Sequence, residues 1–231
     1  MKSARQISSI PATIPAVVGT VHSPASLRAA LRLSAGAVDY LELRVDNFAG
    51  DLKPLLRAVP KLKIPCIVTV RHPREGGANK VGMALRRELY LEFLPHAAAI
   101  DLELRSAEAL SEVIVAARAD GVCVILSTHN FRRTPPIADL VESVRRAYRA
   151  GANVCKLAAF TAKPADTAVL LTLLAKKLPL PLSVMGMGPL GKASRLLLAK
   201  AGSVLNYGYL DAPNAPGQWE ARELKLILSK I

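Results

Sequence analysis

The sequence predicts an α/β fold in which one domain, residues 1–231, forms a single (β/α)8 TIM barrel. Eight short apolar runs alternate with segments of helical periodicity, the pattern of parallel strands joined by helices. The 231 residues suit one such barrel, and no Gly/Ser-rich linker divides them. Aromatic residues make up only 4%, while alanine and leucine are abundant, which favours helices packed on a buried parallel sheet. An open doubly wound sheet is the alternative, but no GxGxxG motif follows the first apolar run.

The strands are expected at the apolar runs rich in Val, Ile and Leu. Cys66, Cys123 and Cys155 each fall in one of them, and none belongs to a CxxC pair. Core packing in a reducing cytosol explains these cysteines better than disulfides or zinc. The expected strands are residues 16–21, 40–44, 66–71, 99–103, 122–128, 154–158, 182–187 and 204–207.

Helices are expected between these strands, where cap residues precede periodic segments. Ser23, Ser106 and Thr134 are expected to cap three helices by accepting free backbone amides, and Pro164 suits the first turn of a fourth. The glycines that follow two of the helices, at positions 121 and 151, suit the left-handed backbone common after a helix end. These four helices are expected at residues 25–33, 107–119, 137–149 and 166–177.

The charge balance is strongly basic: 31 Lys and Arg against 18 Asp and Glu give a formal charge of +13. Nucleic acid, an anionic membrane surface or a small anionic substrate could each account for it. The basic residues are spread along the expected helices without interleaved aromatics, which favours a solvated basic surface and no specific nucleic-acid partner. The segment Met1–Pro15 has no long apolar core, and no run of about twenty apolar residues suggests a membrane span. These features predict a cytoplasmic enzyme.

Lys156 lies in the middle of the apolar run 153–159, which is expected to be a buried strand. A lysine there either extends to an edge of the sheet or serves a function, because burial removes much of its hydration. Desolvation and nearby cations both lower the pKa of an ammonium group, and a neutral lysine forms Schiff bases with ketones and aldehydes. The position therefore suggests a nucleophile.

In a barrel the chemistry lies at the C-terminal ends of the strands, so those ends are compared together. Alternation puts Glu42 and Arg44 on one face, where an ordinary salt bridge is the alternative to a function. Asp101 and Glu103 also share a face, and two interior carboxylates imply interior cations. His129 ends the strand before that of Lys156, and beside a Schiff-base lysine an imidazole is the natural proton carrier.

Three loops after strands are also rich in polar residues and glycine. Residues 71–77 form a charged loop that ends in two glycines, for which a polar turn is the alternative. Residues 185–195 bring glycines and an arginine to a helix start, where backbone and Arg195 could approach an anion. Residues 211–218 form a Pro/Gly loop that is long enough to act as a lid or is simply exposed.

Taken together, these residues resemble the type I 3-dehydroquinate dehydratases, the Schiff-base enzymes of the shikimate pathway. The similarity runs from about Val17 to the C-terminal helix. Two positions differ from the common family pattern. Asn214 stands where Ser is frequent, which bears on closure over the substrate, and Asn130 stands where Asp is frequent, which bears on how the imidazole of His129 is oriented. The motifs that carry the resemblance are residues 42–46, Arg71 with 75–77, 101–103, 127–131, 156–158, 187–195 and 215–218.

The resemblance implies a homodimeric lyase that dehydrates 3-dehydroquinate to 3-dehydroshikimate and needs no metal or organic cofactor. Lys156 would form the imine, His129 would be the general acid and base, and Glu75 would orient His129. The other candidates would contact the substrate. By this resemblance, Arg195 and Gln218 would hold its carboxylate and a neighbouring hydroxyl, Glu42, Arg44 and Arg71 its ring hydroxyls, and Met187 and Asn214 would complete the pocket.

The same mechanism follows from residue chemistry, with Arg44, Arg71 and Arg195 expected to help keep Lys156 neutral. A class I aldolase is the alternative enzyme, although the acid-rich strand ends do not supply the phosphate cradle that a phosphorylated sugar needs. A non-catalytic basic binding protein on a barrel scaffold is the alternative outside enzymes.

Overall fold

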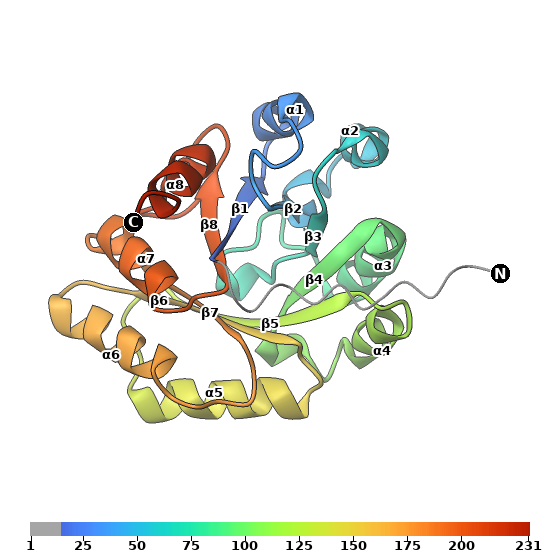
Figure 1. Ribbon diagram of the computed structural model, residues 1–231. Helices are drawn as coiled ribbons and strands as arrows, with labels where there is room; N and C mark the ends of the chain where they lie inside the picture. Colours follow the sequence, from blue (N-terminus) through green and yellow to red (C-terminus); the bar gives the residue numbers. More distant parts are fainter. Residues whose placement is uncertain (1–14) are drawn as a thin grey trace.

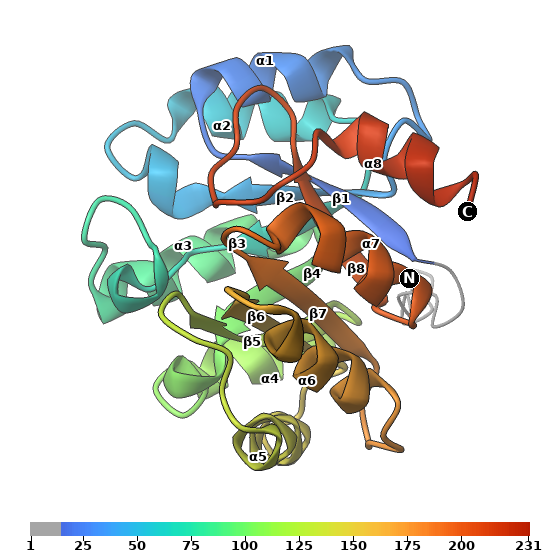
Figure 2. The same cartoon turned by 90° about the vertical axis from the view of Figure 1, so that its left-hand side faces the viewer.

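Eight parallel strands surrounded by helices form the (β/α)8 barrel that the sequence predicts (Figures 1 and 2). The structure is a computed structural model and describes residues 15–231. The expectation for the N-terminal segment therefore lies almost wholly outside the described residues. The strands are β1 (Ala16–Val21), β2 (Tyr40–Arg44), β3 (Cys66–Thr69), β4 (Ala97–Glu103), β5 (Cys123–Asn130), β6 (Val154–Phe160), β7 (Leu182–Met187) and β8 (Leu205–Tyr209).

The helices form the outer ring and follow the strands in chain order. Short 3-10 turns connect several of them to the barrel. Between residues 15 and 231, no helix combines the length and the hydrophobicity that a membrane crossing requires. The helices are α1 (Pro24–Arg32), α2 (Lys53–Ala58), α3 (Met83–Phe93), α4 (Ser111–Ala119), α5 (Ile137–Arg149), α6 (Pro164–Leu174), α7 (Gly191–Lys200) and α8 (Ala221–Leu228).

The strand order is β7-β6-β5-β4-β3-β2-β1-β8, with every paired strand parallel to its neighbour. The seam between β7 and β8 is bridged by the amide of Val204, which donates to the Leu182 carbonyl at 2.9 Å. The Ser183 hydroxyl donates to the Leu205 carbonyl at 2.7 Å and spans the same seam. These bonds bring the two end strands together, so the C-terminal ends of all eight strands surround one central space.

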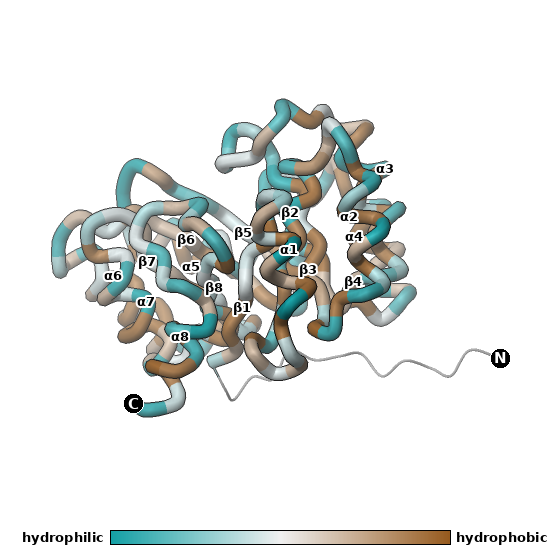
Figure 3. The backbone as a smooth tube through the Cα atoms, turned by 90° about the horizontal axis from the view of Figure 1, so that it is seen from above, coloured by the Kyte–Doolittle hydropathy of each residue, from teal (hydrophilic) through white to brown (hydrophobic). Residues whose placement is uncertain are grey.

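Two apolar layers hold the barrel together. A small cluster fills its interior and includes Val18, Ile67 and Ile125, while a larger cluster lies between the strands and the helices. Viewed from above, hydrophobic and hydrophilic residues alternate along the helices of the ring (Figure 3). Burying one face of each helix is the main source of its stability, because short isolated helices are marginal in water.

Most of the expected element boundaries lie within two residues of the observed ones, and two expected caps are wrong. Ser23 accepts from the amide of Ser26 and caps α1. Ser106 is buried in a polar network, where it donates to Glu103, and α4 begins only at Ser111. Thr134 donates to the Phe160 carbonyl at 2.9 Å and does not cap α5. Ser106 also accepts from Arg86 of α3 at 3.0 Å, so both hydroxyls have partners on elements distant in the sequence, which a local pattern does not reveal.

The glycines and cysteines behave as expected. The glycines after α4 and α5, at positions 121 and 151, have φ values of 69° and 86°, in the left-handed region that ends many helices. The three cysteines are free and buried, and burial raises the pKa of each thiol to about 12. They pack as small apolar side chains.

Candidate active site

One pocket opens at the C-terminal ends of the strands and has a volume of about 110 Å³. All ten candidate residues from the sequence line this pocket, although they come from elements spread over the whole chain. The structure thus brings the expected residues together, as barrel closure requires. The lining comprises Glu42, Arg44, Arg71, Glu75, Gly76, His129, Phe131, Lys156, Ala158, Met185, Met187, Arg195, Tyr207, Asn214, Ala215 and Gln218.

Lys156 projects from β6 into the barrel and is 3% exposed. Its Nζ lies 2.8 Å from Asp101 Oδ2 and 3.4 Å from Glu42 Oε1. The ring of Tyr207 lies below it, with the centroid 3.8 Å from Nζ. The sequence led us to expect cations around this lysine, but its ion pairs are with carboxylates. The expected cations Arg44, Arg71 and Arg195 line the same pocket. The carboxylates reach Lys156 because closing the barrel brings β2 and β4 side chains across the interior to β6.

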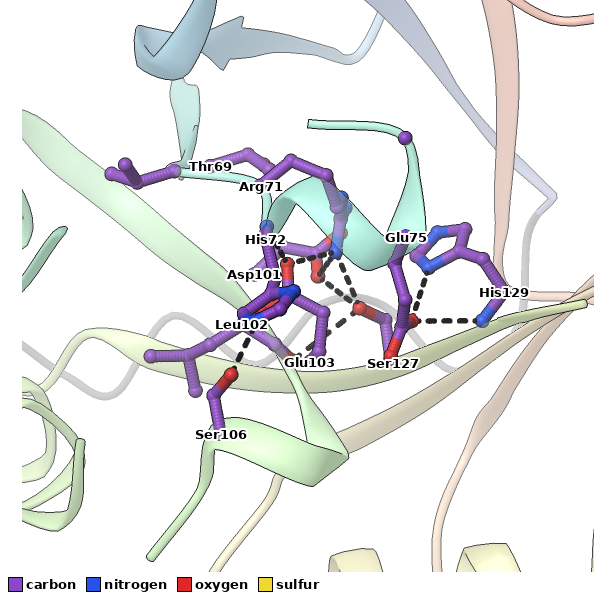
Figure 4. A network of polar contacts seen from close by, with 12 residues as sticks. Thr69, Arg71, His72, Glu75, Asp101, Leu102, Glu103, Ser106, Ser127 and His129 are labelled. Atoms are coloured by element: carbon purple, nitrogen blue, oxygen red, sulfur yellow. Dashed lines mark hydrogen bonds and ion pairs between the residues drawn. The ribbon is translucent and has the colours of Figure 1, made fainter. Parts of the chain in front are cut away.

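Arg71 is the cation that these carboxylates share (Figure 4). Its guanidinium binds Asp101 through two hydrogen bonds of 2.8 and 3.1 Å, and it also donates to Glu103 and Ser127. Burial alone would raise the pKa of Asp101, but Arg71 and Lys156 outweigh it and hold that pKa well below its usual range. Asp101 therefore stays ionised beside Lys156. The interior cations implied by two acids on one strand are present.

Glu103 connects this network to the helix layer. Its Oε1 accepts from the amide of His72 at 2.8 Å as well as from Arg71, and its Oε2 pairs with Arg86 of α3. Arg86 is fully buried and also donates to Ser106 and to the Val70 carbonyl. The chain of charges from Lys156 through Asp101, Arg71 and Glu103 thus ends at a buried arginine, so each buried charge has a partner.

His129 is held by Glu75 at two points (Figure 4). Glu75 Oε2 lies 3.0 Å from His129 Nδ1 and also accepts from the His129 backbone amide at 3.0 Å. When Nδ1 donates to the carboxylate, Nε2 is left as an acceptor, the tautomer that a general base requires. Burial, followed by the charges of Arg71 and Lys156, lowers the pKa of His129 well below its usual value. Burial and the Glu103 charge raise the pKa of Glu75 to about 7.

Asn130 does not touch the imidazole. Its Oδ1 accepts from the amides of Arg132 and Arg133 at 3.1 and 3.0 Å and shapes the turn after β5. The expected effect on imidazole orientation is therefore indirect. Phe131, which the sequence did not single out, stacks beside His129 with ring centroids 6.3 Å apart.

Arg195 lies in the first turns of α7 and is 3% exposed. One nitrogen donates to the Tyr207 carbonyl at 2.9 Å, while its buried Nε has no hydrogen-bond partner. Burial lowers the pKa of Arg195 to about 10, so it remains cationic at neutral pH. A buried cation with an unused donor in a pocket is suited to bind a carboxylate.

The loop between β8 and α8 covers this part of the pocket and is held by its own contacts. Gln218 Oε1 accepts from the amides of Asn214 and Ala215 at 2.9 and 3.2 Å. Gly217 packs so closely on α7 that a Cβ there would lie 2.7 Å from the Cα of Gly191. The Trp219 indole donates to the Lys192 carbonyl at 2.9 Å. These contacts hold Gln218 in the wall of the pocket that Arg195 also lines.

Sequence reasoning overlooked Tyr207 and gave no role to Asp46. Tyr207 ends up under Lys156 because β8 closes the barrel, and its hydroxyl is buried without a partner. Its position near the end of the last strand was the available signal. Across the described range 15–231, no group of three His, Cys, Asp or Glu side chains is arranged to hold a metal ion.

A family model and several sequence relatives relate this chain to the 3-dehydroquinate dehydratases. The type I 3-dehydroquinase family model matches residues 16–231. The 3-dehydroquinate dehydratase of Methanocella arvoryzae is 35% identical over 213 residues, covering 91% of this chain and 94% of the relative. That of Klebsiella pneumoniae strain 342 is 31% identical over 232 residues, covering 94% and 88%.

The chain is also similar in fold to solved structures of 3-dehydroquinate dehydratases. The 3-dehydroquinate dehydratase of Geobacillus kaustophilus superposes with a TM-score of 0.85 at 29% identity, covering 94% of this chain and 91% of that one. A type I enzyme from Clostridium difficile with covalently modified comenic acid gives 0.84 at 28% identity, covering 94% and 92%. Together with the family model and the sequence relatives, these matches show that the chain belongs to the type I 3-dehydroquinase family.

Proposed function

We propose that this protein dehydrates 3-dehydroquinate to 3-dehydroshikimate through an imine on Lys156, with His129 as general acid and base. The observation that carries the proposal is that Lys156, His129 and Arg195 line one pocket in a member of this family. Each supplies a different function: a buried amine, an imidazole oriented by a carboxylate, and a buried cation for an anionic substrate. This combination favours the dehydratase over an aldolase or a binding protein.

The chemical steps use these groups in order. The neutral amine of Lys156 attacks the ring ketone, and loss of the carbonyl oxygen as water leaves an iminium. His129 removes a proton from the adjacent carbon, and the electron pair of that bond forms an enamine. The nitrogen lone pair of the enamine then re-forms the C=N bond, the enamine C=C electrons form the new ring double bond, and the neighbouring hydroxyl is expelled. The hydroxyl takes the proton from His129 and leaves as water. A further water hydrolyses the product iminium and restores Lys156.

The other pocket residues bind and orient the substrate. Arg195 and Gln218 hold its carboxylate and a nearby hydroxyl, and Glu42, Arg44 and Arg71 face the ring hydroxyls. Most N–H groups of the Arg71 guanidinium already donate to Asp101, Glu103 and Ser127. Arg71 therefore contributes to substrate binding mainly through its charge. Met187 and Asn214 complete the wall and the lid of the pocket.

Borohydride trapping tests the assignment. With 3-dehydroquinate present, borohydride should inactivate the protein and leave one reduced adduct on Lys156, since only an imine is reduced there. Lys156→Met should give no adduct and no conjugated product, whereas Lys163→Gln, which changes an exposed lysine, should behave as wild type. Peptide mass spectrometry that located the adduct on Lys163 or Lys192 would reject the assignment.

His129→Ala separates the two steps. Imine formation should survive at least in part, while dehydration should fall by about a hundredfold to ten-thousandfold, the usual effect of losing an acid–base group. A variant that traps normally and dehydrates within about threefold of wild type would remove His129 from the mechanism.

We also propose a cytoplasmic homodimer with 3-dehydroquinate as its small-molecule partner and no metal or organic cofactor. Free, buried cysteines are consistent with a reducing compartment. Light scattering of the purified protein gives its mass in solution, and dehydratase assays in the presence of a chelator test the need for a metal.

A further inference from the structure

We propose that Asp46 is a positioning residue that aligns two parts of the active site at once, the guanidinium of Arg44 and the loop that carries Glu75. The proposal rests on the proposed function, because it assigns consequences for substrate binding and for proton transfer. Asp46 is fully buried, lies just after β2, and is not among the pocket-lining residues.

The first set of contacts fixes Arg44. Asp46 Oδ1 accepts from Arg44 Nε at 3.0 Å, and Oδ2 accepts from Arg44 Nη2 at 2.8 Å. This paired geometry holds the plane of the guanidinium and not only its charge. The same Nη2 donates to the Gly76 carbonyl at 3.0 Å, so Arg44 is also tied to the loop after β3.

The second set of contacts closes that loop. Asp46 Oδ1 accepts from the backbone amide of Arg71 at 3.2 Å, and Oδ2 accepts from the amide of Ala78 at 3.0 Å. One carboxylate therefore binds both ends of the segment 71–78. The segment is tight, because a Cβ at Gly77 would lie 2.1 Å from the Arg71 carbonyl oxygen. Glu75 sits near its middle and holds His129.

Both oxygens of Asp46 are thus saturated, with two N–H donors on each. This makes the carboxylate hard to replace, even by an amide of the same shape. In Asp46→Asn an NH2 group takes the place of one oxygen, and in either orientation it faces two donors. The side chain then loses one contact to Arg44 and one to an end of the loop at the same time.

Four proteins separate a positioning role from general stability. Asp46→Asn is compared with wild type, with Arg44→Gln, and with Asp39→Asn. Asp39 is a matched control, because it also accepts a backbone amide and pairs with a lysine, but it lies at the opposite end of the barrel strands. Each protein is assayed with 3-dehydroquinate across pH, and amide hydrogen exchange is measured without substrate.

The expected pattern is specific. Asp46→Asn should raise KM and lower kcat, with kcat/KM reduced on the order of a hundredfold as for other small misplacements of reacting groups. It should also move the acid limb of the pH profile, which reports the ionisation of Glu75, because the loop that carries Glu75 is no longer held at both ends. Arg44→Gln should raise KM while leaving the acid limb in place. Asp39→Asn should keep kcat/KM within about threefold of wild type. Exchange of the Arg71 and Ala78 amides, which donate to the Asp46 carboxylate, should accelerate only for Asp46→Asn.

Either of two results overturns the proposal: Asp46→Asn changes KM alone, as Arg44→Gln does, or exchange in residues 71–78 is unchanged. If Asp46→Asn does not fold, the variant Asn79→Gly tests the proposal in its place. Asn79 is exposed, has φ of 56°, and donates to the Asp46 and Asn47 carbonyls at the end of the same loop. Its replacement by glycine should move the acid limb and lower kcat/KM, and an unchanged profile would reject the proposal.

Failure of the proposed function is distinguishable from failure of this proposal. A wild-type protein that neither dehydrates 3-dehydroquinate nor traps an adduct would refute the function. The exchange measurement needs no substrate, so it tests the anchoring of residues 71–78 by Asp46 independently.

Discussion

The hydrogen bond between Glu75 and His129 determines whether the imidazole can act as a base. When Glu75 is ionised, Nδ1 donates to it and Nε2 is free to accept a proton. When Glu75 is protonated, its hydroxyl can donate to Nδ1, and the imidazole proton then sits on Nε2. Because the pKa of His129 lies well below its usual value, the imidazole is neutral in either case near pH 7. Of these two groups, Glu75 is the one that titrates in this range.

We therefore predict that kcat/KM falls as the pH is lowered through about 7, the raised pKa of Glu75. The sign follows from the ionised carboxylate being the active form, which is lost below its pKa. Glu75→Gln should lower the plateau and remove this limb. The exposed Glu108→Gln is the control and should keep it. Rate profiles from pH 5 to pH 9 check the prediction, and a limb that persisted unchanged in Glu75→Gln would assign it to another group.

The residues that could be predicted from the sequence carry a local signal. Lys156 is a charge within an apolar run, and His129 stands at a strand end, so position alone made both conspicuous. Asp46 has no such signal, because its partners at Arg71 and Ala78 lie 25 and 32 positions away along the chain. Tyr207 is an ordinary strand residue by type. Its place under Lys156 exists only once β8 meets β1.

Among the elements, strands were easier to locate than helix starts. The bounds of β1, β2 and β7 agree with the sequence at both ends, because β1 and β7 are nearly continuous apolar runs and β2 alternates apolar with charged residues. α4 starts four residues later than expected, because residues 104–106 form a 3-10 turn around the buried Ser106. Helix periodicity does not distinguish such a turn from the first turn of a helix.

The β8–α8 lid is the element whose packing gives the clearest test. Gly217→Ala should raise KM, because its Cβ would collide with Gly191 Cα at 2.7 Å and the Gly188 carbonyl at 2.8 Å. Gly202→Ala shares the positive φ but has open space around its Cβ, so it isolates backbone strain from the collision. Steady-state kinetics and thermal unfolding of both variants separate the two effects.

Asn214 provides a second comparison within the lid. Its backbone amide makes the bond to Gln218, so Asn214→Ala should raise KM only modestly and Asn214→Ser should be nearly silent.

If Gly217→Ala left KM at the value of Gly202→Ala, close packing on α7 would not govern the lid. An Asn214→Ala variant worse than Gly217→Ala would instead assign the side chain a direct role.

At the scale of the whole molecule, the interior and the surface use charge differently. Inside, Lys156, Arg71 and Arg86 are matched by the carboxylates of Asp101 and Glu103 at hydrogen-bond distance, and among the described residues Arg195 is the buried cation of the pocket without such a match. Most of the +13 charge must therefore lie on the surface. There it raises the local concentration of small anions, and we expect it to speed the encounter with the anionic substrate at low ionic strength.

The surface charge should not create a specific nucleic-acid site. Nucleic-acid grooves combine cations with aromatic side chains on which bases stack. Among the described residues, the exposed large aromatics are Phe131, at the pocket, and Tyr148, on α5 near Arg145 and Arg146. One tyrosine beside a few arginines gives electrostatic attraction without a stacking surface. Any binding should then come from phosphate contacts, which weaken steeply as salt rises.

We predict that the protein binds duplex and single-stranded DNA weakly, without sequence preference, and loses both between 50 and about 200 mM salt. Fluorescence anisotropy with two unrelated sequences of equal length measures this directly. The double variant Arg145→Gln/Arg146→Gln should weaken binding equally for both sequences at low salt and leave dehydratase activity unchanged, because neither arginine lines the pocket. Sequence-selective binding that persists at physiological ionic strength would mean that the basic surface has a partner of its own.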